Sequence, residues 1–262
     1  MAGDAHHGSP PVRPDELLAV LDEAADAVVA ALAGTTEWGP SGLRPTQYRS
    51  DVTADAAALA VLDRAGLGVV SEESGARRPE SPVWVALDPL DGSTNAHRRL
   101  PWYATSLAAV DVDGPLAAVV VNLATGTRYR ATRDGGATRD GVPIRTSGAS
   151  VLGQAVVGLS GLPPRSLGWR QFRALGAAAL DLCAVADGTL DGFVDCSDDA
   201  HGVWDYLAGV LVLTEAGGRA ADALGRALAV RDHSARRTPV AGSTALLCRG
   251  LVDARHVAWS EW

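Results

Sequence analysis

Apolar residues near the start of the chain recur at the spacing of an amphipathic helix. Between residues 15 and 33 they fall on one helical face, with Pro14 before the segment and Gly34 after it, both typical helix boundaries. A second helix is predicted from Asp51 to about residue 64. Two short apolar runs, residues 67–70 and 83–87, are rich in β-branched side chains or tryptophan, and we interpret both as buried strands.

Further along, the pattern first favours hairpins and then alternates between strands and helices. Strands are predicted at 104–112, 116–122, 129–132, 136–138, 155–159, 190–194 and within 240–247, and helices at 173–188 and 203–216. Gly and Ser gather near residues 147–150, where we place a boundary. The predicted organisation is a disordered tail (1–14), an N-terminal α+β half (15–148) and a C-terminal α/β half (149–262).

Composition and charge exclude several classes of protein. A length of 262 residues with 47% hydrophobic and 21% charged residues is typical of a globular protein with a substantial core. The net charge of −8 argues against a nucleic-acid partner, which needs a basic surface. Three cysteines without a Cys-x-x-Cys pair suggest buried or free thiols. Without a visible signal peptide or membrane span, the expectation is a cytoplasmic protein with no membrane partner.

One turn carries two carboxylates directly after a predicted buried strand. Asp88 and Asp91 lie three positions apart around Pro89, and Gly92 and Ser93 follow. Carboxylate oxygens suit Mg²⁺, and free N–H groups at a helix start suit a phosphate. The segment therefore indicates a metal-assisted phosphate site, although Asp-Pro and Asp-Gly pairs are also ordinary turn residues.

Three blocks of the chain together resemble the inositol monophosphatase family. They are Glu72-Glu73 after a strand, Asp88-Pro89-Leu90-Asp91-Gly92-Ser93-Thr94-Asn95, and Trp204-Asp205 opening a helix. The similarity extends over roughly residues 15–250. It implies the family's layered αβαβα sandwich, a mixture of α+β and α/β organisation. It also implies a metal-dependent phosphatase acting on a small-molecule phosphate ester, and a homodimer.

The resemblance also implies a site that holds two or three Mg²⁺ ions. The metal ligands would be Glu72, Asp88, the carbonyl of Leu90, Asp91 and Asp205. Glu72 would also be catalytic, together with Asp55 and Ser93, whose paired side chains would orient the attacking water. The phosphate would bind to the N–H groups of Gly92, Ser93 and Thr94.

The leaving group is expected to lie beside Asp195, Ala178 and His201. Asp195 stands where the inositol enzymes carry a glutamate, and the loop from Asp195 to Trp204 is about three residues longer than in the family. The predicted substrate is a polyol or sugar phosphate such as inositol 1-phosphate. Histidinol phosphate, fructose 1,6-bisphosphate or a nucleotide stays open as an alternative. So does a non-catalytic ligand-binding role, which the shortened segment Val52–Asp55 would suit.

Overall fold

The computed structural model describes residues 13–36, 38–44 and 47–260. The predicted disordered tail, residues 1–14, lies outside this range except for its last two residues, and Pro14 is the first residue of α1 (Pro14–Ala33). All three cysteines are free and buried, as predicted. None of the helices in the described ranges is long and apolar enough to cross a membrane.

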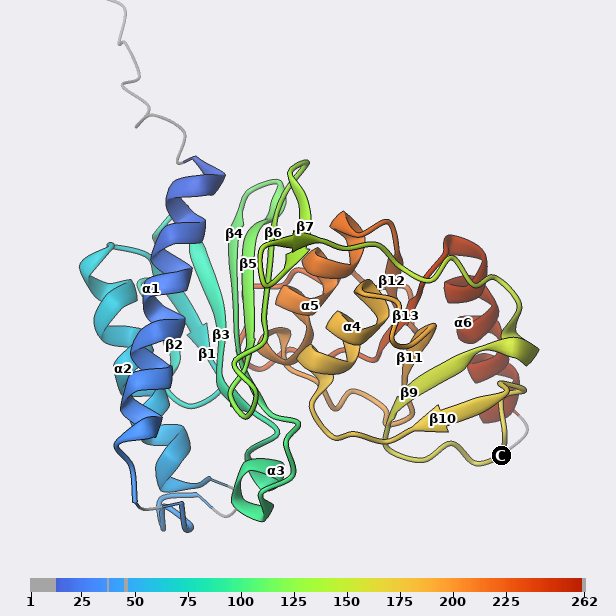
Figure 1. Ribbon diagram of the computed structural model, residues 1–262, viewed down its shortest axis with the longest axis horizontal. Helices are drawn as coiled ribbons and strands as arrows, with labels where there is room; N and C mark the ends of the chain where they lie inside the picture. The colour runs from blue at the N-terminus through green and yellow to red at the C-terminus, as the bar shows by residue number, and fades with distance from the viewer. Residues whose placement is uncertain (1–12, 37, 45–46, 261–262) are drawn as a thin grey trace, which may run out of the picture.

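Helices and sheets alternate in five layers (Figure 1). Helices α1 and α2 (Arg49–Arg64) cover one face of an eight-stranded sheet. Helices α4 (Ala178–Ala186) and α5 (Val203–Glu215) lie between that sheet and a five-stranded sheet, and α6 (Ala245–Ser260) covers the outer face of the second sheet. This order confirms the αβαβα sandwich.

The first sheet has the strand order β2-β1-β3-β4-β5-β6-β7-β8. Only β1 and β3 are parallel within it, and every other neighbouring pair is antiparallel. Its strands are β1 (Gly68–Ser71), β2 (Gly75–Arg77), β3 (Trp84–Asp91), β4 (Ala104–Asp111), β5 (Gly114–Asn122), β6 (Arg128–Thr132), β7 (Gly136–Arg139) and β8 (Val142–Pro143). A short helix, α3 (Ser93–Arg98), links β3 to β4.

The second sheet has the order β10-β9-β11-β13-β12. Its strands are β9 (Val156–Ser160), β10 (Gln171–Arg173), β11 (Gly192–Asp195), β12 (Arg219–Asp222) and β13 (Pro239–Gly242), and a 3-10 turn, η1 (Leu152–Gln154), precedes them. The chain therefore changes sheets between β8 and β9. The division of the chain at residue 148 stays a prediction.

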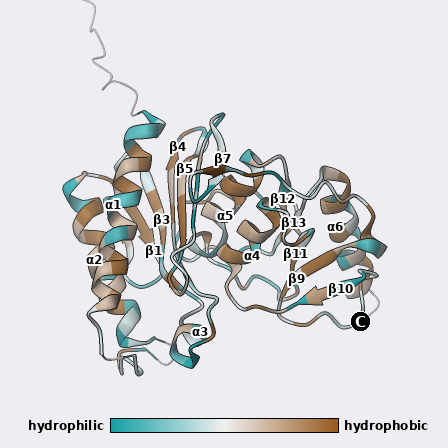
Figure 2. Cartoon of the chain, viewed as in Figure 1, coloured by the Kyte–Doolittle hydropathy of each residue, from teal (hydrophilic) through white to brown (hydrophobic). Residues whose placement is uncertain are grey.

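The central helix layer is packed closely because its side chains are small. Every residue of α4 is buried. In α5, a Cβ added to Gly209 would lie 2.7 Å from the Cβ of Leu182, so the glycine lets the two helices approach. Figure 2 shows apolar residues concentrated on the strands that the helices cover. Burial of this apolar surface is the main stabilising contribution to the fold.

Two sequence predictions about helices were wrong. The helix predicted at 173–188 begins only at Ala178, because Gly176 has a φ of +86° and Ala177 is extended. Gln171–Arg173 instead pairs with β9 as an edge strand. The long helix α6 was missed: it buries a narrow stripe that includes a charged residue, Arg255, and this obscures the apolar pattern in the sequence.

Candidate functional site

The end of β3 brings Asp88 and Asp91 into the interior. All eight residues of β3 are buried, and its pairing with β4 shifts register between Asp88 and Asp91. The N–H of Leu90 donates to Asp88 Oδ1 at 2.9 Å and fixes that carboxylate. Gly92 has a φ of +81°, and an added Cβ would lie 3.1 Å from two backbone carbonyl oxygens, so only glycine fits this turn.

Two other elements bring further acids to the same place. Glu72 follows β1, which is parallel to β3, and Asp205 lies in the first turn of α5. Carboxylate oxygens of Glu72, Asp88 and Asp205 all lie within 4.8 Å of one another. Asp91 Oδ2 accepts the N–H of Ala179 at 2.8 Å, which ties the cluster to the start of α4. The four predicted acidic ligands therefore converge from separate segments.

Burial and mutual repulsion raise the pKa of each of these four carboxyl groups. Arg44 lowers the pKa of Glu72 and Arg236 lowers that of Asp205, but burial outweighs both. A buried cluster of hard oxygen donors with uncompensated negative charge fits divalent cations such as Mg²⁺. The residues present therefore suit the metal that the sequence predicts.

The predicted pair of Asp55 and Ser93 does not form in this structure. Asp55 instead accepts a hydrogen bond of 2.5 Å from Ser71 Oγ, and no hydrogen bond joins Asp55 to Ser93, both described residues. Asp51, four residues earlier, is the acid of this helix whose charge raises the pKa of Glu72. Burial raises the pKa of Asp51 itself to about 6. Sequence analysis missed Asp51, although the shortened spacing before Asp55 was a signal.

Two residues that precede α2 contact Glu73. Arg44 and Gln47 both donate to the Glu73 carboxylate, and Arg44 also donates to the Glu73 carbonyl at 2.7 Å. These contacts occupy the Glu73 side chain, whereas Glu72 lies within the acid cluster. The two residues therefore hold the strand end that presents Glu72.

A cavity of about 290 Å³ opens beside the acids. Asp91 and Asp205 line it, as do Ala178 and His201, two of the three residues predicted at the substrate pocket. Burial lowers the pKa of His201 to about 4, so its imidazole is neutral at pH 7. The cavity also contains Asp181, which sequence analysis did not single out.

Asp195, the third predicted substrate residue, does not line this cavity. It is fully buried, and its Oδ2 lies 3.7 Å from His201 Nδ1 without a hydrogen-bond partner in the described structure. Arg255, itself 2% exposed, donates to the carbonyl of Asp195 at 2.9 Å. His201 therefore lies on the cavity wall, and Asp195 lies in the interior next to it.

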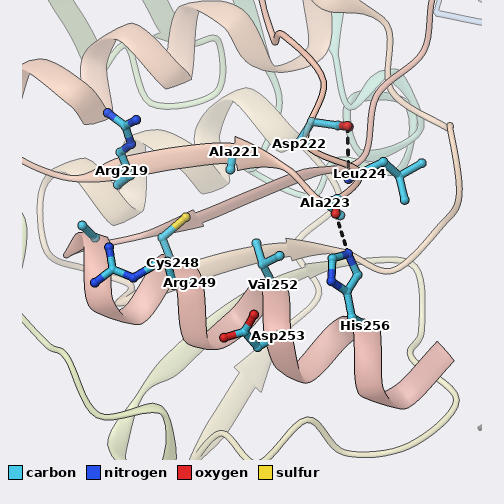
Figure 3. A pocket seen from close by; sticks show the side chains of 12 residues that line it. Arg219, Ala221, Asp222, Ala223, Leu224, Cys248, Arg249, Val252, Asp253 and His256 are labelled. Atoms are coloured by element: carbon cyan, nitrogen blue, oxygen red, sulfur yellow. Dashed lines mark hydrogen bonds between the residues drawn. The ribbon is translucent and has the colours of Figure 1, made fainter. Parts of the chain in front are cut away.

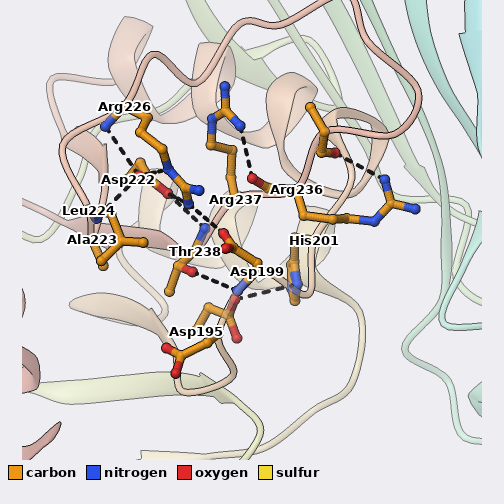
Figure 4. A network of polar contacts seen from close by, with 12 residues as sticks. Asp195, Asp199, His201, Asp222, Ala223, Leu224, Arg226, Arg236, Arg237 and Thr238 are labelled. Atoms are coloured by element: carbon orange, nitrogen blue, oxygen red, sulfur yellow. Dashed lines mark hydrogen bonds and ion pairs between the residues drawn. The ribbon is translucent and has the colours of Figure 1, made fainter.

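The long loop after β11 is held by an ionic network (Figure 4). Arg226 donates to both Asp222 and Asp199, with its shortest bond to each at 2.7 and 2.6 Å. The N–H of Asp199 donates to Thr238 Oγ1 at 3.1 Å. These contacts place the loop residue His201 at the cavity.

A larger cavity, about 730 Å³, lies between β12 and α6 (Figure 3). Its lining includes Arg219, Cys248, Arg249 and His256 but none of the four clustered acids. His256 is held there by the carbonyl of Ala223, 2.6 Å from its Nε2. The acid-lined cavity is therefore the better candidate for chemistry, although it is smaller.

The fold and the site define a layered α/β protein with a buried acidic centre suited to divalent cations. Comparison with known proteins identifies the family. The model of the inositol monophosphatase family matches residues 50–256. A "Fructose-1,6-bisphosphatase/inositol-1-monophosphatase" from Archaeoglobus fulgidus is 38% identical over 184 residues, which cover 68% of this chain and 71% of the relative.

Two further similarities agree with this match. The "Nus factor SuhB" of Escherichia coli is 34% identical over 174 residues, 60% of this chain and 63% of that protein. The structure of an inositol monophosphatase from Anabaena (Nostoc) sp. PCC 7120 superposes with a TM-score of 0.78 at 26% identity, covering 95% of this chain and 99% of that chain. The chain belongs to the inositol monophosphatase family, whose members are metal-dependent phosphatases.

Proposed function

We propose that this protein is a Mg²⁺-dependent phosphomonoesterase that hydrolyses a small polyol or sugar phosphate, with inositol 1-phosphate as the leading candidate. One observation carries the proposal: four buried or half-buried acids from three separate segments converge beside a cavity of about 290 Å³. Several carboxylates from different elements are what a site for more than one cation requires.

The chain's own groups divide into two ligand sets. Glu72, Asp88 and the Leu90 carbonyl would hold one cation, and Asp88, Asp91 and Asp205 a second. Bound Mg²⁺ would neutralise the phosphoryl oxygens, favour ionisation of a water near pH 7 and stabilise the leaving alkoxide. The N–H groups of Gly92, Ser93 and Thr94, at the start of α3, would hold the phosphate.

The water-orienting role fits Asp51 better than Asp55. Asp51 acts electrostatically on both Glu72 and Glu73 and accepts hydrogen bonds only from its sequence neighbours Tyr48 and Ser50. The Asp55 carboxylate is instead bonded to Ser71, on β1. A carboxyl group whose pKa is about 6 can accept a proton near neutral pH. Ser93 remains a proposed partner for the water, since it directly follows Gly92 at the start of α3.

The cavity wall favours a monophosphate. None of the described residues that line the cavity is an arginine, so a second phosphate group would have no cation beside it there. Histidinol phosphate remains an alternative, and fructose 1,6-bisphosphate and nucleotides are less well matched to this wall. The homodimer and the cytoplasmic location stay predictions.

The test is phosphate release from a panel of esters with and without Mg²⁺. We expect Mg²⁺-dependent turnover in the wild type and its loss in Asp91→Asn. Asp187→Asn, an acid that caps the other end of α4 and does not line the cavity, is the matched control and should retain turnover. A folded wild-type protein that binds Mg²⁺ but hydrolyses no ester would refute the proposal and favour the non-catalytic ligand-binding role.

A further inference from the structure

Asp181 is a buried acid on the cavity wall that is not one of the proposed metal ligands. It lies in the first turn of α4, is 1% exposed and lines the same cavity as Asp91 and Asp205. The carboxyl groups of Asp181 and Asp91 line the same cavity, and the charge of Asp181 contributes to the raised pKa of Asp91. A carboxyl group in this position needs a partner, because burying it without one is costly.

One oxygen of Asp181 has a partner and the other has none. Oδ1 accepts the indole N–H of Trp102 at 2.8 Å. No hydrogen bond from a described residue reaches Oδ2. The described polar atoms that lack both a partner and solvent access do not include it, so Oδ2 is accessible to solvent. Because Asp181 lines the cavity, Oδ2 is the oxygen that is open to it.

The orientation of Asp181 is set by a rigid support. The Asn95 side-chain amide donates to the carbonyl of Trp102 at 2.7 Å and to that of Leu175 at 2.8 Å. These two bonds hold the backbone of Trp102 next to the segment that precedes α4. A recognition group held in this way loses little entropy when a ligand binds.

The neighbouring carboxyl group, Asp195, is sealed from the cavity, so it does not offer this contact. The side chains of Ala177 and Ala178, which also line the cavity, are small and leave room for a ring. Besides the carboxyl groups, the described polar side chains on the wall are those of Ser160 and His201.

We propose that Asp181 is a specificity-determining residue whose Oδ2 accepts a hydrogen bond from a hydroxyl group of the leaving alcohol, with Trp102 as its positioning residue. The inference rests on the proposed phosphatase function and adds to it the recognition of a hydroxylated leaving group. An ester whose alcohol has no further hydroxyl leaves Oδ2 unpaired and is disfavoured.

The test compares inositol 1-phosphate with 4-nitrophenyl phosphate, whose leaving group has no additional hydroxyl. In Asp181→Asn, the amide oxygen can still accept the Trp102 N–H, but the group facing the cavity becomes a donor. We expect kcat/KM for inositol 1-phosphate to fall about tenfold to a hundredfold, with 4-nitrophenyl phosphate changed less than threefold. Trp102→Phe should shift the same ratio in the same direction by a smaller factor.

Asp187→Asn is the matched control. Asp187 caps the other end of α4 and accepts an aromatic hydroxyl, that of Tyr129, at 2.9 Å, but does not line the cavity. Its substitution should leave the substrate ratio unchanged. Equal loss on both substrates in Asp181→Asn, or no loss on either, overturns the proposal.

A binding comparison keeps the inference testable if a variant misfolds or no ester is hydrolysed. In the wild type, cyclohexyl phosphate, the ring without hydroxyls, should bind about tenfold or more weaker than inositol 1-phosphate in competition or calorimetry. Equal affinities would overturn the role of Asp181. Absence of turnover with this affinity difference intact would instead refute the phosphatase function alone.

Discussion

Neutralising one acid of the cluster should stabilise the metal-free protein while destroying its metal site. Asp91→Asn keeps the side-chain oxygen that accepts the Ala179 N–H, so the local hydrogen bond survives. The substitution removes a group whose pKa is raised from 3.8 to about 8, first by burial and then by neighbouring acids such as Asp181 and Glu72. An amide carries no charge, so the variant avoids the free-energy cost of burying or protonating a carboxylate when the chain folds.

The size of the effect follows from the linkage between protonation and folding. At pH 7 the unfolded chain carries an ionised Asp91, and folding must protonate it, which costs about 1.4 kcal/mol per pH unit above 3.8 and thus about 4 kcal/mol. Part of this cost arises from repulsion by the neighbouring acids, and those acids can take up a proton in place of Asp91, so removing Asp91 does not recover the whole of it. We therefore expect a net gain of about 1–3 kcal/mol, or about 3–10 °C in Tm for a chain of this size.

The assay is thermal unfolding at pH 7, with a chelator and then with excess Mg²⁺. Metal at a hundred times its dissociation constant should stabilise the wild type by about 2.7 kcal/mol and Asp91→Asn far less. Asp222→Asn is the matched control, for which we expect the opposite change in stability. Although burial raises the pKa of Asp222, hydrogen bonds from Arg226 and Thr238 lower it below 3.8, so this variant should be destabilised. A lower Tm for Asp91→Asn than for the wild type in chelator would refute the electrostatic reasoning.

Three further predictions follow from the same site. Between about pH 5 and 8 the metal-free protein should lose stability as pH rises, because the folded cluster, with pKa values raised to about 8 in Glu72 and Asp205, binds more protons than the unfolded chain. Urea unfolding in chelator measures this, and a flat profile over that range contradicts it. Gly92→Ala should cost about 2 kcal/mol, since alanine is strained at a φ of +81°; chemical unfolding checks it, with no change as the contrary result. Asp51→Asn should lower kcat about a hundredfold with KM little changed, and more than Asp55→Asn does; steady-state kinetics with the reverse order would restore the role to Asp55.

Local sequence was sufficient to predict the elements whose conformation restricts the residue types they can contain. The apolar run of β3 and the turn at Gly92 were both predicted, because strand burial and positive φ leave direct marks on residue type. The acidic ligands were likewise predicted from motif blocks, and the structure places them together. The edge strand β10 escaped prediction because its three exposed residues have no apolar pattern.

Tertiary structure alone decided how the carboxyl groups around the cavity differ. Asp51, Asp55 and Asp181 lie in helices and Asp195 ends a strand, yet the four identical side chains differ mainly in their partners in the fold. Asp55 is bonded to Ser71 and Asp195 is sealed beside His201, whereas Asp181 opens to the cavity. The sequence by itself determined the family and the fold, and it predicted the acids that the structure brings together. Which acid faces water, metal or substrate depends on burial and on partners far away in the chain, which no local pattern encodes.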